Sequence, residues 1–257
     1  MVLIIILVIL AFILFMLIKS YFNLRFIVNE FRDSNMIVFG KKGSGKDLLF
    51  QTVINKRKQF HYSNINYHKK TLPITINDLS LFPNTYDNLI NNTVEKVNPN
   101  LKENYDIYIS DGGIILPSQY DYALDKKYPS LPIFYATQRH LYNSNTHVNT
   151  QYLGRLYKKL REQADGYIKC HRALFIGPIY IQALTFYERY ETAERSLLPM
   201  QKSLLNGMQN GMYEQYYATN GIIKPMFIIG IKKKINYNTR YFKDVFFKNH
   251  KDIQKVN

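Results

Sequence analysis

The chain is 257 residues long and strongly basic, with 34 Lys and Arg against 19 Asp and Glu and a formal net charge of +15. This length suffices for a membrane anchor and one well-packed domain. A hydrophobic content of 46% excludes a disordered main domain, and the one cysteine excludes an intrachain disulfide framework and a Cys-rich metal site. The charge favours anionic partners such as nucleic acid, nucleotides or an anionic membrane face, although the bias of an AT-rich genome explains it equally well.

The N-terminal residues form an apolar segment of membrane-spanning length. Met1 to Ile18 are apolar without interruption, and Lys19 ends the run. A helix of this length spans about 27 Å, close to the thickness of the bilayer hydrocarbon. No basic side chain precedes the run and no Ala-x-Ala site follows it, so we expect an uncleaved anchor over 1–20 and a juxtamembrane linker over 21–34. Because the basic residues lie on the C-terminal side of the anchor, the remaining chain is expected in the cytoplasm.

The rest of the chain alternates between patterns of strands and helices. Strands are predicted over 35–39, 73–76, 106–111 and 131–136, helices over 46–58 and 148–164, a surface loop over 56–70, and one or two strands plus a hairpin over 166–186. Such alternation predicts the α/β class, with a mostly parallel sheet flanked by helices. We expect one domain over 35–190 and a helical, basic C-terminal segment over 191–257.

A glycine-rich motif follows the first predicted strand and opens the first predicted helix. It matches G-x-x-x-x-G-K, with Asp at the position that usually holds Ser or Thr. Glycines let successive backbone N–H groups point at phosphate oxygens, and the start of the helix favours the same anion. The motif therefore predicts a P-loop that binds ATP with Mg²⁺, in which Lys46 reaches the β- and γ-phosphates and the Asp47 carboxylate holds the metal. The predicted nucleotide-binding residues are Gly40, Lys41, Lys42, Gly43, Ser44, Gly45, Lys46 and Asp47.

Other polar residues at strand ends are candidates for catalysis. Asp111 ends the predicted strand 106–111, where a Walker B carboxylate would hold Mg²⁺, although Gly112 occupies the position at which many ATPases have Glu. The alternative is a simple Asp-Gly turn. Gln138 directly follows the predicted strand 131–136 and is a candidate γ-phosphate sensor, or else a polar cap of that strand. Candidate arginine fingers, each of which is otherwise a solvated surface charge, are Arg139, Arg155 and Arg161.

Several motifs together resemble the zonular occludens toxin-like (Zot) family of filamentous-phage assembly ATPases, within the P-loop NTPases of the FtsK/HerA type. They are the P-loop 40–46, Tyr108-Ile109-Ser110-Asp111, Ala136-Thr137-Gln138-Arg139, Asp165-Gly166-Tyr167-Ile168 and Tyr237-Asn238-Thr239-Arg240-Tyr241. The resemblance implies an ATPase in the inner membrane of a host cell, with a single span and a cytoplasmic ATPase domain. It would drive extrusion, assembly or packaging of single-stranded DNA phage particles, with phage assembly proteins as partners. Familiar members carry the membrane helix after the ATPase domain, whereas here the apolar segment precedes it.

Three functions therefore compete. The first is an oligomeric membrane ATPase that moves or packages single-stranded DNA, for which a basic tail with Lys232-Lys233-Lys234 and Arg240 offers phosphate contacts. The second is a nucleotide or small-molecule kinase, because a Gly-Lys-Asp P-loop also occurs among such enzymes. The third is a membrane scaffold that binds nucleotide without hydrolysing it, for which Asp47 and Gly112 are the motivating departures.

Overall fold

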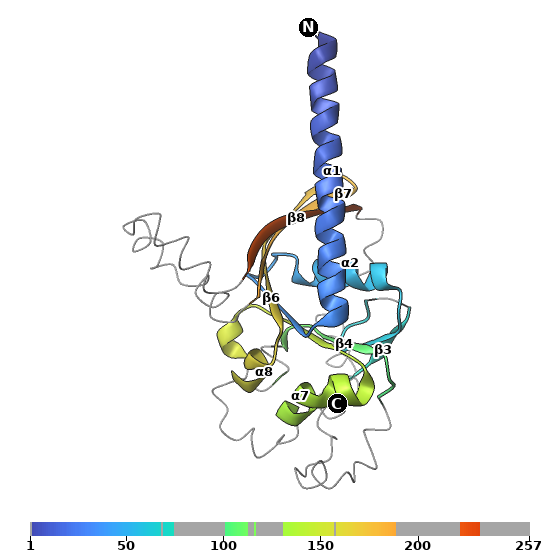
Figure 1. Cartoon of the computed structure of the whole chain (residues 1–257), viewed down its shortest axis with the longest axis vertical. Coiled ribbons are helices and arrows are strands. Elements are labelled where there is room, and N and C mark those ends of the chain that lie inside the picture. The colour runs from blue at the N-terminus through green and yellow to red at the C-terminus, as the bar shows by residue number, and fades with distance from the viewer. Residues whose placement is uncertain are drawn as a thin grey trace, which may run out of the picture.

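A computed structural model describes residues 2–67, 69–74, 101–112, 116, 131–156, 158–188 and 222–231 (Figure 1). The helices are α1 (Val2–Asp33), α2 (Lys46–Arg57), α7 (Leu131–Tyr142) and α8 (Lys158–Glu162), with a 3₁₀ turn η1 at Leu153–Arg155. The strands are β1 (Met36–Phe39), β2 (His61–Ser63), β3 (Thr71–Pro73), β4 (Asp106–Ile109), β5 (Thr146–Thr150), β6 (Gly166–Ile176), β7 (Ile179–Tyr187) and β8 (Ile223–Ile231). The basic tail with Lys232-Lys233-Lys234 and Arg240, and the motif Tyr237-Asn238-Thr239-Arg240-Tyr241, lie outside the described residues.

One mixed sheet organises the domain. Its strand order is β3-β2-β4-β5-β1-β6-β7-β8, and the pairs from β3 to β6 are all parallel, whereas β7 and β8 are added antiparallel. The predicted α/β fold with a mostly parallel sheet is confirmed. Because β1 lies between β5 and β6, the loop that follows β1 opens at the centre of the carboxyl edge of the parallel strands, where α/β proteins bind ligands.

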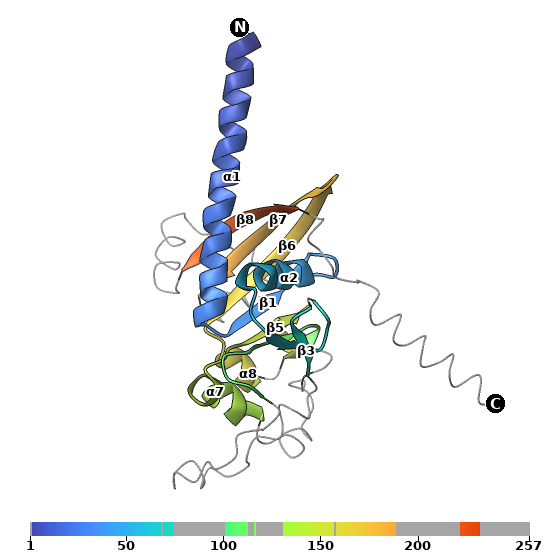
Figure 2. The ribbon, with the colours of Figure 1, turned by 90° about the vertical axis from the view of Figure 1, so that its right-hand side faces the viewer.

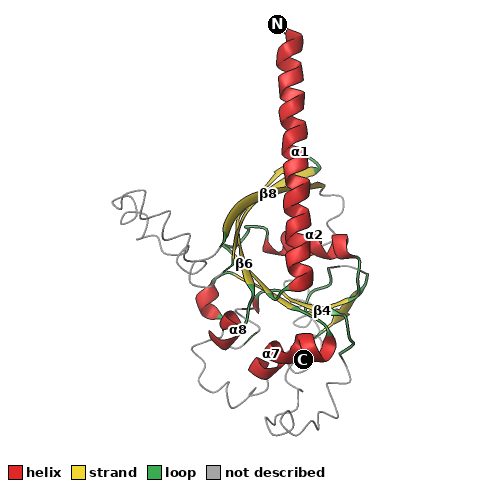
Figure 3. Cartoon of the chain, in the orientation of Figure 1, coloured by secondary structure: helices red, strands yellow, loops and turns green. Residues whose placement is uncertain are grey.

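Helices cover both faces of the sheet (Figures 2 and 3). Successive β1 side chains point to opposite faces. Met36 and Val38 join the cluster that contains side chains of α1 and α2, and Ile37 and Phe39 join the cluster that contains side chains of α7 and α8. All four β1 side chains are buried, as expected of a central parallel strand.

Helix α1 is long and apolar enough to cross a membrane, although a signal sequence near an N-terminus passes the same test of length and composition. Its first half stands clear of the domain (Figure 2). The helix then continues without a break to Asp33, through the segment expected to be a juxtamembrane linker. Ile27 and Phe31 are fully buried against the sheet, so this second half belongs to the core of the domain.

Four sequence predictions about elements are wrong. Residues 131–142 form helix α7 instead of a strand, because Phe134, Gln138 and Tyr142 recur every fourth residue and are all buried. Within the predicted surface loop 56–70, strand β2 lies buried beside β4. The predicted helix 148–164 is replaced by the end of β5, the turn η1 and the short helix α8. The C-terminal segment 191–257, expected to be helical and basic, is a strand over Ile223–Ile231, which form β8, and its other residues except Ile222 lie outside the described part of the chain.

Candidate nucleotide-binding site

The loop between β1 and α2 has the backbone of a phosphate-binding loop. Gly43 and Gly45 have φ of 77° and 88°, in the left-handed region that L side chains rarely adopt. The Ser44 N–H donates to the Lys41 carbonyl at 3.1 Å, which closes the turn. A Cβ at Gly40 would lie 2.3 Å from the Cys170 carbonyl oxygen, so the loop and β6 approach too closely for any side chain there. Helix α2 then begins at Lys46, with its N-terminus at the loop.

Two polar groups inside this loop are suited to an anion. The Lys46 ammonium lies over the loop and donates to the carbonyls of Gly40 at 3.1 Å and Lys41 at 3.3 Å. The Ser44 hydroxyl is buried and has no hydrogen-bond partner among the described residues. A buried hydroxyl without a partner is costly, and a phosphate oxygen in the loop would satisfy it. The loop, Lys46 and the start of α2 thus fit a nucleotide phosphate.

Asp47, in the first turn of α2, is held by three side-chain donors. Its Oδ1 accepts hydrogen bonds from the Tyr67 hydroxyl at 2.7 Å, the Ser110 hydroxyl at 2.6 Å and the Asn149 amide at 2.7 Å. These donors come from the segment after β2, the end of β4 and the end of β5. The carboxylate therefore ties α2 to the neighbouring strands of the sheet.

Asp111 lies just beyond β4, at the same edge of the sheet, as the Walker B prediction requires. Its φ of 51° turns the chain sharply after the strand, and its N–H donates to the Asn149 Oδ1 at 2.8 Å. Burial raises the pKa of the Asp111 carboxyl, the negative charge of Asp47 raises it further, and the Lys46 ammonium lowers it. The two carboxylates and the ammonium therefore share one electrostatic environment.

This donor set fits a magnesium ion. Mg²⁺ in nucleotide sites is held by one or two carboxylates together with phosphate oxygens and water. Asp47 and Asp111 supply the carboxylates beside the phosphate loop, and the negative charge of Asp47 raises the pKa of the Asp111 carboxyl, a repulsion that a cation would relieve. The described residues contain no group of three or more His, Cys, Asp or Glu able to hold a metal, so at this site the phosphate oxygens and water would have to complete the coordination.

Asn149, which the sequence analysis missed, lies near the end of the strand beside the P-loop strand, the place that was expected of Gln138. Strand β5 lies between β1 and β4, so its carboxyl end separates the P-loop from Asp111. The Asn149 amide donates to Asp47 while its carbonyl oxygen accepts from the Asp111 N–H, and the side chain is fully buried. The alternation of Thr146, Val148 and Thr150, all β-branched, was the available signal for a strand.

Other missed residues support the site from further along the chain. The Asn64 side chain pairs with the Ser110 backbone at 2.8 and 3.0 Å, which fixes the end of β4. The Gln182 amide on β7 donates to the Gly45 carbonyl at 2.7 Å, next to the start of α2. Asn64 and Gln182 are single polar residues with no motif around them, so one sequence does not identify either as part of a site.

Gln138 lies away from the nucleotide. It is on α7, where its amide donates to the Asn35 Oδ1 at 2.8 Å and its carbonyl oxygen accepts from the Thr146 hydroxyl at 2.5 Å. Asn35 precedes β1 and Thr146 begins β5, so Gln138 lies at the amino edge of the parallel strands, opposite the P-loop. The expectation that Gln138 follows a strand next to the P-loop is therefore wrong, and with it the basis for a γ-phosphate sensor at this residue.

The three candidate arginine fingers differ in their surroundings. Arg139 forms an exposed ion pair with Asp165 at 2.7 Å, at the amino edge of the sheet. Arg161 is buried within its own domain, so it cannot reach a neighbouring subunit as folded. Arg155 is exposed in the turn after β5, a strand whose carboxyl end lies beside the P-loop strand, and its guanidinium lies 5.3 Å from the Tyr152 ring. Only Arg155 keeps the position expected of a finger acting in another subunit.

A strand, a glycine-rich loop and a helix that begins with lysine, beside a neighbouring strand that ends in aspartate, define the fold of this chain as that of a P-loop NTPase. Solved structures with a similar fold include the N-terminal domain of zonular occludens toxin from Neisseria meningitidis, with 16% identity, a TM-score of 0.41, and coverage of 63% of this chain and 90% of that one. A second is the genome packaging NTPase B204 from Sulfolobus turreted icosahedral virus 2 in complex with AMP, with 17% identity, a TM-score of 0.37, and coverage of 54% and 75%. A third is the FIGL-1 AAA domain, with 12% identity, a TM-score of 0.32, and coverage of 53% and 42%.

At such identities and TM-scores, the assignment of the fold depends on the topology and loop geometry of this chain itself. No protein-family model matches the sequence, and no curated protein sequence matches it either.

Proposed function

We propose that this protein is a membrane-anchored, Mg²⁺-dependent ATPase that acts as a homo-oligomer and drives extrusion, assembly or packaging of single-stranded DNA phage particles. In this proposal α1 spans the inner membrane of the host cell once and the P-loop domain lies in the cytoplasm. The motifs that resemble the Zot family and the net charge of +15 support a DNA-linked role.

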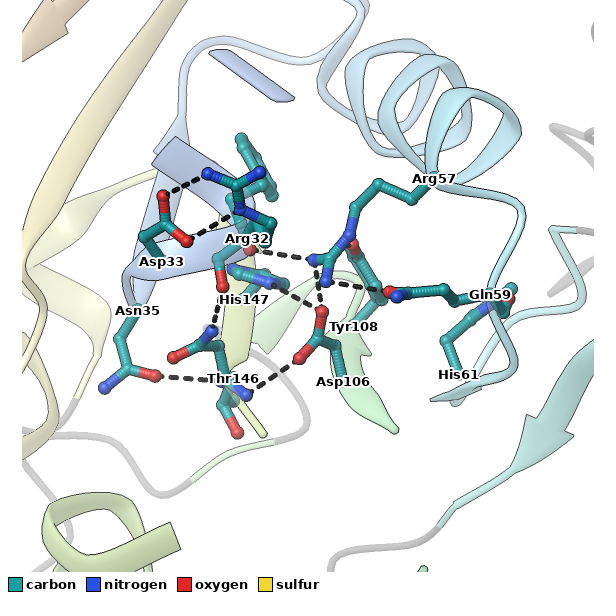
Figure 4. Close-up of polar contacts among 12 residues, drawn as sticks. Arg32, Asp33, Asn35, Arg57, Gln59, His61, Asp106, Tyr108, Thr146 and His147 are labelled. Atoms are coloured by element: carbon teal, nitrogen blue, oxygen red, sulfur yellow. Dashed lines mark hydrogen bonds and ion pairs between the residues drawn. The ribbon is translucent and has the colours of Figure 1, made fainter. Parts of the chain in front are cut away.

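The observation that carries the proposal is the direct attachment of α1 to the helix that begins at the P-loop. Arg57, at the end of α2, donates to the Phe31 carbonyl of α1 at 2.8 Å and pairs with the buried Asp106 of β4 (Figure 4). The Asn145 amide donates to the Arg32 carbonyl at 2.7 Å. A motor that works at a membrane needs its nucleotide site joined firmly to its anchor, and here one helix, α2, contacts both.

Each residue of the site has a role in this proposal. Lys46 and the loop amides bind the β- and γ-phosphates, and Asp47 and Asp111 hold the metal with Asn149 positioned between them. The bound Mg²⁺ would neutralise negative charge on the phosphates during transfer. Hydrolysis has to proceed without the usual glutamate, because position 112 is glycine. A Cβ at Gly112 would lie 2.2 Å from the Val148 Cγ1, so the surroundings leave no room for a side chain there.

The absence of a catalytic glutamate at Gly112 favours a second candidate function, a scaffold that binds nucleotide without hydrolysing it. One measurement separates the candidates: ATP hydrolysis by the full chain in detergent, with and without single-stranded DNA, for the wild type and Lys46→Ala. We expect turnover that DNA stimulates and that Lys46→Ala abolishes. Nucleotide binding without turnover would establish the scaffold, and transfer of the phosphoryl group to a nucleotide or small molecule would establish a kinase.

A further inference from the structure

The turn between β6 and β7 carries an apolar surface that is about half exposed. Leu174, Phe175 and Ile176 are 45%, 52% and 63% exposed, and Ile179 and Ile231 are 44% and 53% exposed. Since successive strand residues point to opposite faces, both faces of the ribbon are apolar and open at this end. Exposed apolar patches of this kind mark contacts with membranes or other proteins. We call these five residues the hairpin tip.

The hairpin tip lies level with the apolar part of α1. Along β8, the Asn23 amide donates to the Phe227 carbonyl at 3.0 Å, and the Ile229 N–H donates to the Ser20 hydroxyl at 2.7 Å. An advance of two residues along β8 therefore corresponds to three residues along α1, toward its N-terminus. Continued for two more strand residues, this correspondence places Ile231 level with Leu17. Figure 2 shows the tip of the β6–β7 hairpin as the end of the sheet that rises toward the N-terminal half of α1.

Sheet register places the remaining tip residues at this level. Ile231 pairs with Ile179, and Ile179 pairs with Ile176 across the turn. Leu17 belongs to the uninterrupted apolar run that ends at Lys19. The tip therefore reaches the depth at which that run would enter the hydrocarbon.

The charges around the tip suit an anionic lipid surface. Strands β6, β7 and β8 contain no Asp or Glu. The Lys19 ammonium, at the end of the apolar run of α1, lies 5.8 Å from the centre of the Phe227 ring. Lysines beside aromatic rings at the end of an apolar helix are typical of the headgroup zone of a bilayer.

We propose that the hairpin tip inserts into the lipid–water boundary of the same bilayer that α1 crosses, so that the domain is held to the membrane at two points. This inference rests on the proposed membrane span of α1. Lipid is the occupant because any protein that covered a surface at this depth would itself have to lie in the membrane. Apolar side chains of interfacial segments reach about 5–10 Å into the headgroup and acyl boundary.

The same strand connects this contact to the nucleotide loop. On β7, the Tyr180 hydroxyl lies 2.8 Å from the Thr52 hydroxyl of α2, and the Gln182 amide donates to the Gly45 carbonyl. A Cβ at Gly230 would lie 2.3 Å from the Tyr180 ring, so the ring crosses β8 only because that position is glycine. Membrane contact at the tip would therefore orient the P-loop relative to the bilayer.

The test uses single-cysteine labelling of the full chain, because the native Cys170 is buried and reacts poorly. An environment-sensitive dye is attached at Ile176→Cys, at Leu10→Cys in α1, or at Lys158→Cys on α8, whose side chain is exposed at the opposite end of β6. The protein is reconstituted into vesicles of phosphatidylethanolamine and anionic phosphatidylglycerol that contain spin-labelled lipids. We expect lipid quenching at Ile176 to be several-fold stronger than at Lys158 and closer to that at Leu10.

The outcomes separate the two proposals. Quenching at Leu10 with none at Ile176 would overturn insertion of the tip while leaving the anchor intact. A dye at Ile176 that is shielded only as protein concentration rises, without lipid quenching, would instead assign the tip to a second copy of the chain. Absence of quenching at Leu10 and Ile176 alike would overturn both the anchor and the tip.

Discussion

Asp47 is the residue at which this P-loop departs most from the usual pattern, and its charge has a measurable consequence. Without a metal, the carboxylates of Asp47 and Asp111 face the bound phosphates. Unit charges about 4 Å apart repel by several kcal/mol at a partly buried site. We therefore expect chelation of Mg²⁺ to weaken ATP binding by at least about 10-fold in the wild type and by much less in Asp47→Thr, measured by titration of a fluorescent ATP analogue.

The control for this prediction is Asp47→Asn. It keeps an oxygen that can accept from Tyr67, Ser110 and Asn149 but removes the charge. If Asp47→Asn binds ATP with the same metal dependence as the wild type, the charge of Asp47 is not the cause.

Asn149 offers a second test at the residue scale. Asn149→Ala removes a donor from Asp47 and the acceptor of the Asp111 N–H, both at the site. We expect turnover to fall by about 100-fold, as when one positioned donor is lost from a catalytic site, with a much smaller change in nucleotide affinity. Thr150→Val, on the same strand, is the matched control, and equal losses in the two variants would show a general disturbance of β5.

The residues of the site were partly predictable. A local motif of closely spaced residues identified Lys46 and Asp47, and a strand-end position identified Asp111. Asn149, Asn64 and Gln182 reach the loop only through the order of strands in the sheet, and that order depends on contacts between distant segments. Gln138 was misplaced for a different reason, because its role was inferred from a predicted strand that is in fact helix α7.

Among the elements, helix α2 has a role at each end: its start lies at the P-loop, and its end carries Arg57, which we expect to stabilise the fold. Arg57 and Asp106 form a buried ion pair with side chains 10% and 7% exposed, and Arg57 also satisfies a carbonyl in the last turn of α1. Removing one partner of a buried pair typically costs about 3–5 kcal/mol. We expect Arg57→Met to lower the thermal midpoint of the full chain in detergent markedly.

The double variant Arg57→Met with Asp106→Leu tests the physical reason. It removes both charges of the buried pair, so it should recover much of the lost stability. A double variant no more stable than Arg57→Met alone would mean that the bond from Arg57 to the Phe31 carbonyl, rather than the buried charge, dominates.

Which elements could be predicted depended on the strength of their local pattern. β1, β4 and the β6–β7 hairpin are continuous apolar or β-rich runs closed by glycine, and they appear as predicted. The apolar run 131–136 fits a buried strand and a buried helix equally well by periodicity. β5 is short and mostly polar, so its β-branched alternation is a weak signal, and β8 contains Pro225 and lies in a basic context; their pairing in the sheet identifies both as strands.

At the scale of the whole molecule, the buried His147 should make the free energy of unfolding depend on pH. Burial lowers the pKa of His147 and the Arg57 charge lowers it further, while Asp106 at 3.9 Å opposes them; the rings of Phe31 and Tyr108 complete its surroundings. The folded protein thus holds the neutral ring, whereas the unfolded chain takes up a proton below pH about 6.5. Stability should therefore fall as the pH drops through that value.

Thermal unfolding in detergent at neutral pH and about one unit below pH 6.5 measures this dependence. The wild type should lose stability at the lower pH, and His147→Phe, which cannot take up a proton, should lose less. An equal loss in the two proteins would assign the pH dependence to other groups.

If the protein acts as an oligomer, as proposed, Arg155 of one subunit should be needed for ATP turnover in the next. This arginine is exposed on the P-loop side of the sheet, so in a ring it would face the nucleotide of a neighbouring subunit. We expect Arg155→Ala to bind ATP normally but to lose most of its turnover, since a finger supplied by another subunit is worth about 10³–10⁵ in rate.

A mixture of two variants tests whether Arg155 acts between subunits. A subunit with Arg155→Ala keeps its own Lys46, and a subunit with Lys46→Ala keeps its own Arg155. Mixed assemblies of the two variants should therefore regain turnover that neither variant has alone, because some sites then pair an intact loop with an intact arginine. A mixture as inactive as its components would show that Arg155 does not act between subunits.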